Sequence, residues 1–417
     1  MDRSGAARLP ASLTDWIADL WSRQLFPGPC KGDDSPPSLR SLAILVVLPA
    51  ILLYPCLGFH LFEPDESRYA QIPREMLDRS DLIVPTLQGE PYLDKPPLFY
   101  WMVMLSYRIF GAHDWSARLV PAIAAHLTLL LTYLLGRRTM GERPAFWAAL
   151  VLALAPGFLG MSRLLILDGL LTLFVTLALF AGYEALRGNT LRKGWWLLAS
   201  VAVGLAVLTK GPVALLLFLP PLWLHRRLSG KGCVPSRGDL VLFGLIVLAI
   251  TLPWYIALSL RVPEFVRYFF WEHNVKRFLA PDVHVRGIWF YFPILWLVLF
   301  PTTLLLLPVA RYLSRLTPED ADRRSVHLGF HLLAGGWCVL FFTLSACKLP
   351  TYILPALPFL ALGLGAFLVE TDWQSSRLFR HSLQASFALM MLGHYLVLPW
   401  YAWYRSPMSR PADVLAL

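Results

Sequence analysis

The sequence predicts an all-α protein that spans a membrane many times, and three observations support this fold class. Of the 417 residues, 57% are hydrophobic and only 15% are charged, and the mean hydropathy is +0.55. Soluble domains contain about 45–50% apolar and about 25% charged residues. The apolar residues also occur in long blocks, and a helix needs about 20 such residues to cross the hydrocarbon core of a bilayer. These properties exclude a soluble globular protein.

Along the chain, about eleven apolar blocks are long enough to be transmembrane helices. They cover residues 41–59, 118–136, 144–162, 164–185, 195–210, 212–225, 239–260, 287–309, 329–346, 351–369 and 383–403. Residues 97–111 form a shorter apolar block, which we expect to lie on the interface or dip into it. We expect residues 41–403 to form one transmembrane domain, followed by a short extracytoplasmic tail over residues 404–417.

Residues 1–40 precede the first apolar block and form a predicted cytoplasmic arm. Within this arm, Trp16, Ile17, Leu20 and Trp21 fall on one helical face. This spacing predicts an amphipathic helix on the membrane surface. A flexible arm with chance periodicity is the alternative.

The net charge of +10 is distributed unevenly across the predicted membrane. With the N-terminus inside and eleven spans, 21 of the 37 Lys and Arg residues fall in inner segments, nearly all in short loops. The positive-inside rule therefore supports a cytoplasmic N-terminus in the plasma membrane. Two long loops, residues 60–117 and 261–286, then lie outside. The surplus of positive charge is explained by topology, so we expect no nucleic-acid partner.

Three carboxylates begin the first outer loop. Glu63, Asp65 and Glu66 lie directly after the first apolar block. A solvated loop start, with Asp65 capping a helix over residues 66–77, is one explanation. Capping does not exclude catalysis, and packing alone does not require three carboxylates there.

A further carboxylate, Asp168, falls about five residues inside the block 164–185, or about 7 Å deep at 1.5 Å per residue. A carboxylate inside an apolar helix is costly and indicates a functional site. Snorkelling to the interface or pairing with Arg163 is the structural alternative.

Cations recur at the same predicted face. Lys95 precedes two prolines, which hold the backbone extended. Lys210 and Lys348 lie in predicted tight turns broken by proline, and the second outer loop contains Glu272, His273 and Arg277.

Cations and carboxylates at one membrane face suit sugar transfer from a polyprenyl-phosphate donor. The lipid tail lies among the helices, and Lys or Arg neutralises its phosphate at the boundary. Fixed cations also stabilise the negative charge that the leaving phosphate gains in the transition state. A carboxylate accepts the proton of the acceptor hydroxyl. This single displacement inverts the anomeric centre and needs neither a nucleotide nor an obligatory metal.

The motifs resemble those of a known family. Phe62–Ala70 is similar to the start of the first periplasmic loop in bacterial lipid A aminoarabinose transferases, which are related to the protein O-mannosyltransferases. The similarity continues in order through Pro73–Met76, Asp94–Pro97 with Tyr100 and Trp101, Arg118, Arg163–Asp168, Leu208–Pro212, Phe269–Asn274 with Arg277 and Phe278, and Leu344–Tyr352. The matched motifs occur between about residue 60 and about residue 370. All of them fall at the predicted outer face. The family's enzymes carry further spans and a soluble periplasmic domain after the part matched here.

The resemblance implies a GT-C fold in a bacterial inner membrane, with an extracytoplasmic site and a polyprenyl-phosphate sugar donor, undecaprenyl phosphate in a bacterium. From the residues and the resemblance together we predict catalytic residues Asp65, Asp168 and Glu66; donor phosphate-binding residues Lys95, Arg68, Lys210, Lys348 and Arg277; and further site residues Tyr69, Glu272, His273 and Tyr352. Some members hold a metal near the positions of Asp94 and His273. We expect that no cofactor is required.

Two other classes of function remain open at this point. A transporter or flippase of lipid-linked sugars would share lipid grooves and intramembrane charges, but it should show inverted repeats and broken helices near the midplane. A non-catalytic scaffold would be expected to lack Asp65 and Asp168, which are both present. Among transferases, the sugar stays open between aminoarabinose, another pentose and a hexose such as mannose. The acceptor stays open between lipid A or another glycolipid, a polysaccharide and a protein.

Overall fold

The fold is described from a computed structural model of the chain. The structure describes residues 36–371 except 56, 231, 280–283 and 315–324, together with 381 and 384. The predicted amphipathic helix around Trp16, the apolar block 383–403 and the tail 404–417 lie outside the described residues.

The described chain is almost entirely helical. Its main α-helices are α2 (Leu39–Leu53), α3 (Asp65–Asp78), α4 (Leu98–Phe110), α5 (Asp114–Met140), α6 (Glu142–Leu154), α7 (Pro156–Ser162), α8 (Leu167–Leu186), α9 (Lys193–Lys210), α10 (Val213–Ser229), α11 (Arg237–Arg261), α16 (Leu328–Leu344) and α17 (Leu357–Glu370). Shorter elements are the strands β1 (Thr86–Leu87) and β2 (Glu90–Pro91), the π-helix η2 (Arg267–Lys276), α12 (Arg277–Leu279), η3 (Ile288–Phe290), α13 (Tyr291–Val298), η4 (Thr302–Leu305), α14 (Leu306–Ser314) and the 3-10 helix η5 (Pro350–Ala356).

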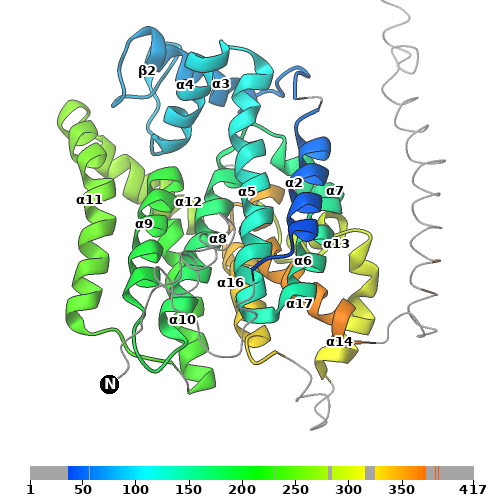
Figure 1. Ribbon diagram of the computed structural model, residues 1–417. Helices are drawn as coiled ribbons and strands as arrows, with labels where there is room; N and C mark the ends of the chain where they lie inside the picture. The colour runs from blue at the N-terminus through cyan, green and yellow to red at the C-terminus, as the bar shows by residue number, and fades with distance from the viewer. Residues whose placement is uncertain are drawn as a thin grey trace, which may run out of the picture.

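The long helices form a bundle, and the first predicted outer loop covers one end of it (Figure 1). In the bundle, α8 packs against α9 and α5, α6 packs against α17 and α5, and α11 lies along α9. Small residues allow the closest of these approaches. A Cβ added at Gly365 of α17 would lie 2.1 Å from the carbonyl oxygen of Pro144 in α6, so only glycine permits this helix contact.

The number of eleven transmembrane helices is not confirmed. Among the described residues, four segments are long and apolar enough to cross a membrane: α5, α8, α11 and the stretch Pro350–Glu370. A fifth is present if α6 and α7, which meet at an angle of 66°, count as one span. The remaining predicted blocks in the described part contain helices that are shorter, broken or less apolar.

Proline explains where two predicted spans break. Pro156 begins α7, and the preceding Ala155 is extended (ψ 113°), as expected for a residue before proline. The predicted span 287–309 is divided into η3, α13, η4 and α14. It contains Pro293, Pro301 and Pro308, each of which lacks a backbone donor and disfavours a continuous helix.

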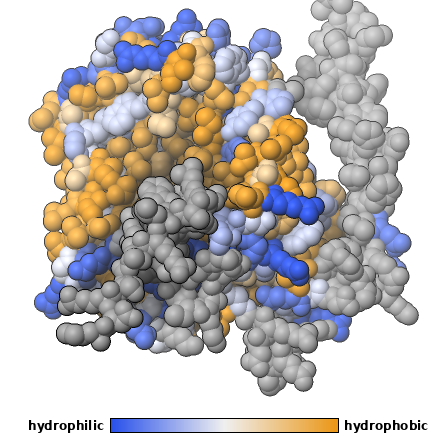
Figure 2. All heavy atoms as spheres, in the orientation of Figure 1, coloured by the Kyte–Doolittle hydropathy of each residue, from blue (hydrophilic) through white to orange (hydrophobic). Residues whose placement is uncertain are grey.

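The surface is consistent with a membrane setting. Figure 2 shows a broad apolar band between hydrophilic atoms at the two ends of the visible face. Helix α11 illustrates the band, because only 28% of its most apolar window is buried within the protein. Leu245, Leu252 and Ile256 are among its exposed side chains. Such an apolar belt is expected where lipid replaces water as the solvent.

The first outer loop folds as α3, a hairpin and α4. Strands β1 and β2 pair antiparallel, with Leu87 opposite Glu90. The two residues between the strands, Gln88 and Gly89, have positive φ values of 56° and 84°, as in a type I′ hairpin turn. The carboxylate of Glu75 in α3 accepts hydrogen bonds from both turn amides at 2.8 and 3.2 Å. The hairpin is therefore fixed to α3. The short block predicted over residues 97–111 is present as α4.

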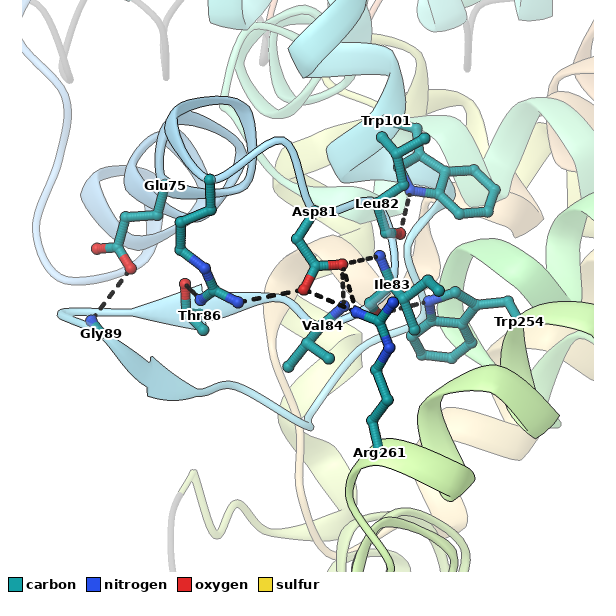
Figure 3. A network of polar contacts seen from close by, with 11 residues as sticks. Glu75, Asp81, Leu82, Ile83, Val84, Thr86, Gly89, Trp101, Trp254 and Arg261 are labelled. Atoms are coloured by element: carbon teal, nitrogen blue, oxygen red, sulfur yellow. Dashed lines mark hydrogen bonds and ion pairs between the residues drawn. The ribbon is translucent and has the colours of Figure 1, made fainter.

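A polar network attaches this loop to α11 (Figure 3). Both oxygens of Asp81 lie 3.0 Å from Nη1 of Arg261 at the end of α11. One oxygen of Asp81 also accepts the amides of Ile83 and Val84 at 2.9 and 3.4 Å. The indole of Trp254 in α11 donates to the carbonyl of Ile83 at 2.9 Å. The loop that carries Lys95 is thus held against the bundle on its α11 side.

Replacing Asp81 with Asn should loosen this attachment. Burial by itself raises the pKa of Asp81, but the two amides, Arg261 and Arg79 outweigh it and hold the pKa below its usual value. A depressed folded-state pKa means that the contribution is complete above about pH 4 and is lost as the pH falls through the lowered value. We expect Asp81→Asn to cost about 1–3 kcal/mol of loop attachment, measured as faster limited proteolysis within residues 60–117. Asp78→Asn, an exposed carboxylate at the end of α3, is the control; equal rates for the two variants at pH 7 would contradict the role of Asp81.

Candidate active site

The carboxylates after α2 divide into an exposed one and a buried one. Asp65 is the first residue of α3, Pro64 occupies the N-cap position, and no side chain caps the helix. The predicted capping role of Asp65 is therefore wrong. Its side chain is 47% exposed and lies 3.7 Å from Arg68. An exposed carboxylate without a tight partner is available to accept a proton.

Glu66, in contrast, is 2% exposed and fully engaged. Arg118 of α5 donates to both of its oxygens, at 2.9 and 2.7 Å. The backbone amides of Phe62 and Leu165 donate at 2.9 and 2.6 Å. Four donors occupy the carboxylate, so its placement does not fit the catalytic role predicted from the sequence. Glu66 instead joins the loop start to α5 and to the segment before α8.

Arg118 completes this connection from the other side. It is buried, and it donates to the backbone carbonyls of Leu57, Phe59 and His60 as well as to Glu66. Its guanidinium also lies 3.7 Å from the centre of the Phe59 ring. Residues 57–60, the start of α3 and the segment before α8 are therefore all held by one buried ion pair.

Asp168 lies shallower in its helix than the sequence predicted. Because α8 begins at Leu167, Asp168 is in the first helical turn and not five residues inside. It does not pair with Arg163, which donates to the carbonyl of Leu52. One oxygen of Asp168 binds Lys210, and the other accepts the hydroxyl of Thr351 at 2.8 Å. Both oxygens are occupied, so Asp168 holds Lys210 in place.

Lys210 is positioned by the end of α9 and by its neighbours. It is the last residue of α9, and Gly211 follows with φ of +89°, a conformation that favours glycine. Its ammonium group lies 4.0 Å from the centre of the Tyr352 ring, a cation–π contact. Both Lys210 and Tyr352 line a cavity.

A chain of polar groups holds Lys95 at the same cavity. Nζ of Lys95 lies 2.6 Å from Nε2 of His273 in η2. Nδ1 of His273 faces a carboxylate oxygen of Asp94 at 3.6 Å. That carboxylate accepts the hydroxyls of Tyr268 at 2.6 Å and Tyr92 at 3.1 Å. Residues from the two predicted outer loops therefore meet here, and the histidine accepts from the lysine while its Nδ1 proton faces the carboxylate.

The charge state of this pair follows from its surroundings. Burial is the main cause that lowers the pKa of Lys95, and the positive charges of Lys210 and Arg277 act in the same direction. Asp94 opposes them, and the resulting pKa is about 7. Burial and the nearby Lys95 also lower the pKa of His273, which keeps the imidazole neutral. Nearby positive charges repel each other, and a bound anion relieves this repulsion. We therefore expect this cluster of cations to bind an anion.

The cavity between these groups has a volume of about 490 Å³ and two kinds of wall. Its polar wall contains Lys95, Lys210, His273, Asn274, Arg277 and Tyr352. Its apolar wall contains Val213, Leu216, Phe270, Phe278, Phe341 and Phe342. No Asp or Glu of the described chain lines it. The arrangement fits an amphiphile with an anionic head.

Tyr69, a further predicted site residue, is buried in α3 and does not line this cavity. Burial raises the pKa of Tyr69 well above its usual value, and Tyr92, Asp65, Asp168 and Tyr352 add to the rise.

Three residues predicted for the site lie elsewhere. Lys348 donates to the backbone carbonyls of Arg286 and Ser345 and thereby holds its own turn. Glu272 is exposed and lies 3.6 Å from Arg267. Arg68 contacts Asp65 and donates to Tyr92 at 3.5 Å, and it does not line the cavity. The placements do not fit direct phosphate binding by Lys348 or Arg68.

Asp94 and His273 alone fit a metal poorly. Within the described chain, no group of three or more His, Cys, Asp or Glu side chains could hold a metal ion. Zinc usually takes at least three protein ligands, and Nε2 of His273 already faces Lys95. The expectation that no cofactor is required stays a prediction.

The sequence analysis assigned no role to several residues that shape the site, although Thr351 lies within the matched motif Leu344–Tyr352. Thr351 holds the second oxygen of Asp168, and Tyr92 and Tyr268 hold Asp94. Tyr92 lies two residues before Asp94 in the chain, which is a weak signal. Thr351 and Tyr268 are distant in sequence from their partners, so only the fold brings them together.

Known proteins are similar to this chain in sequence and in fold. A family model described as dolichyl-phosphate-mannose-protein mannosyltransferase matches residues 94–256. The chain is 34% identical over 374 residues to undecaprenyl phosphate-alpha-4-amino-4-deoxy-L-arabinose arabinosyl transferase 1 of Pseudomonas fluorescens, covering 83% of this chain and 62% of the relative. A transferase of the same description from Edwardsiella ictaluri is 34% identical over 353 residues, covering 82% of this chain and 61% of the relative.

The structural similarity is decisive for the fold. The crystal structure of ArnT from Cupriavidus metallidurans bound to undecaprenyl phosphate superposes with a TM-score of 0.72 and 25% identity, covering 85% of this chain and 63% of ArnT. The chain belongs to the GT-C superfamily. The resemblance inferred from the motifs is thereby confirmed. This GT-C chain spans about three fifths of the length of the curated relatives it matches.

Breaking the Glu66–Arg118 pair in this GT-C protein should destabilise the fold and not merely reduce activity. Removing one partner leaves a buried charge uncompensated, which costs about 3–5 kcal/mol. We expect Glu66→Ala to lower the thermal unfolding temperature clearly. Glu63→Ala, an exposed carboxylate three residues earlier, should leave it unchanged. A Glu66→Ala protein with wild-type unfolding temperature would contradict the structural role.

Proposed function

We propose that the chain is an inverting glycosyltransferase that uses a polyprenyl-phosphate-linked sugar as donor and works at the extracytoplasmic face of the inner membrane. The observation that carries this proposal is the cavity in which Lys95, Lys210 and Arg277 lie beside an apolar wall. A lipid phosphate needs both features at once, because its charge must be paired while its tail stays out of water.

The donor phosphate binds between the cations. Its prenyl chain follows the apolar wall toward the exposed side chains of the bundle. During transfer, the oxygen of the acceptor attacks the anomeric carbon while the bond from that carbon to the phosphate oxygen breaks. The leaving phosphate gains negative charge, which the fixed cations stabilise. No acid is needed to protonate it.

Asp65 accepts the proton of the acceptor hydroxyl. Asp168 cannot serve as the base without releasing Lys210 and Thr351, and Glu66 carries four donors. Asp65 alone among these three carboxylates is exposed and has no partner closer than 3.7 Å. The three acidic residues therefore divide into one base and two positioning groups.

Aminoarabinose is the sugar that the relatives' names favour. The chain matches only 62% of the first of these relatives, so the acceptor is not transferred from them. Lipid A, another glycolipid, a polysaccharide and a protein hydroxyl remain candidates. Mass spectrometry of envelope glycolipids and glycans from a deletion strain would identify the sugar and the acceptor. The mass that is lost identifies the sugar, and the molecule that loses it is the acceptor.

Asp65→Asn should abolish transfer to a hydroxyl acceptor. Removing a general base costs about 10²–10⁴-fold in rate, and a phosphate acceptor, which is already a nucleophile, should be affected less. Turnover of a radiolabelled polyprenyl-phosphate sugar by purified protein measures the effect. The control Glu63→Gln removes an exposed carboxylate two residues away and should keep wild-type turnover. Full activity of Asp65→Asn on every acceptor would exclude Asp65 as the base.

Lys95→Ala should weaken donor binding and slow turnover while the protein stays folded. The loss of a fixed cation opposite the leaving phosphate is expected to reduce the rate by about 10²–10³-fold. Lys276→Ala, which removes an exposed cation of the same outer loop as His273, should have little effect. If Lys95→Ala has the unfolding temperature of the wild type and also turns over the donor at the wild-type rate, the phosphate site lies elsewhere.

The same assay separates transfer from transport. A flippase would move the lipid-linked sugar without forming a glycosylated acceptor or free polyprenyl phosphate. Release of polyprenyl phosphate in step with product therefore supports the transferase. Asp168 lies in the first turn of its helix and not near the midplane, where transporters bind their substrates.

A further inference from the structure

A second cavity lies at the opposite end of α8 from the proposed donor site. It has a volume of about 370 Å³. Its lining consists of Tyr183, Leu186, Arg187, Leu222, His225, Arg226, Ser229, Gly232, Val326 and His327. These residues come from the last turns of α8 and α10, from the segment after α10 and from the start of α16. None of them belongs to the proposed catalytic machinery.

The length of α8 indicates where this cavity lies across the membrane. The helix has 20 residues, so it is about 30 Å long, which matches the hydrocarbon thickness of a bilayer, about 30 Å. Asp168 is in its first turn, and Arg187 follows its last residue. The two cavities therefore lie at the headgroup levels of opposite leaflets. A donor phosphate bound near Lys210 cannot also occupy the second cavity.

The charge around the second cavity is positive. Glu184 does not line the cavity; it is fully buried and lies 2.9 Å from Arg187 of the lining, 2.9 Å from Arg192 and 4.0 Å from Arg138. One carboxylate thus faces three guanidinium groups. Arg226 adds a further cation on the wall, and no Asp or Glu of the described chain lines the cavity.

Arg187 also has an unused donor. Its side chain is only 5% exposed, and its Nε has no hydrogen-bond partner among the residues that the structure describes. Buried donors of this kind normally find an acceptor. On the same wall, His327 lies 2.7 Å from the hydroxyl of Tyr183, and the imidazole of His225 also lines the cavity.

We propose that this second cavity binds a phosphate group, carried by the headgroup of an anionic phospholipid. Guanidinium groups recognise phosphate oxygens with paired, charge-assisted hydrogen bonds. Leu186, Leu222 and Val326 give the cavity an apolar side for the first carbons of the lipid. An inorganic phosphate ion shares the head chemistry without the tail, so the two sources can be told apart by experiment.

Two neighbouring arginines provide a matched pair of variants. Arg226 and Arg227 are both exposed cations in the last turn of α10. Only Arg226 lines the cavity, whereas Arg227 lies 5.7 Å from the ring centre of Trp223. Substituting either with Gln removes one charge from the same surface. Arg187 is unsuitable for this purpose because it also pairs with Glu184.

The test titrates the full chain in detergent with phosphatidylglycerol or phosphatidylcholine and counts bound lipid by native mass spectrometry. A Lys95→Ala background weakens phosphate binding at the donor site. We expect saturable binding of phosphatidylglycerol in preference to phosphatidylcholine. Arg226→Gln should weaken it by about tenfold, the effect of losing one charge-assisted hydrogen bond, and Arg227→Gln by less than about twofold.

A second arm adds inorganic phosphate at constant ionic strength. If phosphate displaces phosphatidylglycerol and by itself raises the unfolding temperature in an Arg226-dependent way, the phosphate site is supported with a soluble ion as its source. If phosphate has no effect while phosphatidylglycerol binds, the lipid source is supported. Equal weakening by Arg226→Gln and Arg227→Gln, or equal binding of the two lipids, overturns the proposal.

Discussion

The buried ion pair between Glu66 and Arg118 is the interaction on which the arrangement of the loop 60–117 against the bundle depends. It joins α3 to α5, and through further hydrogen bonds it also holds the segment after α2 and the segment before α8. Because both side chains are removed from water, each charge is tolerable only in the presence of the other. The position of Asp65, one residue before Glu66, is a consequence of this pairing. So is the start of α8, where Asp168 lies.

A second buried pair, Asp168 with Lys210, applies the same principle to the cavity itself. The carboxylate fixes a lysine at the membrane boundary, where a free lysine side chain would otherwise turn to water. Lys95 is held differently, through the neutral imidazole of His273, which accepts its hydrogen bond while Asp94 is held by two tyrosines. The cations are therefore positioned before any phosphate arrives, and such preorganisation is what electrostatic stabilisation of a leaving group requires.

The two ends of α8 illustrate how one helix length organises the protein. A 20-residue helix matches the hydrocarbon thickness, so charged groups at its ends lie where lipid phosphates lie. At one end the charges surround the proposed donor cavity, and at the other they surround the proposed lipid site. Between them the helix is almost completely buried. Arg187 and Arg226, which the positive-inside rule assigns to topology alone, therefore also have a proposed binding role at the second cavity.

The sequence by itself determined the membrane class, the approximate helix positions and the polar face at which Lys95, Lys210 and His273 meet. Apolar block length and ordered motifs are local properties of the chain. The sequence also predicted the superfamily correctly. Only the tertiary structure decided which carboxylates are occupied. Glu66 and Asp168 bind partners 52 and 42 residues away in the chain, whereas the contact of Asp65 is Arg68, three residues along and 3.7 Å away. The tertiary structure likewise moved Lys348 and Glu272 out of the cavity and divided the block 287–309. These outcomes depend on contacts between distant segments, which residue spacing along one chain does not reveal.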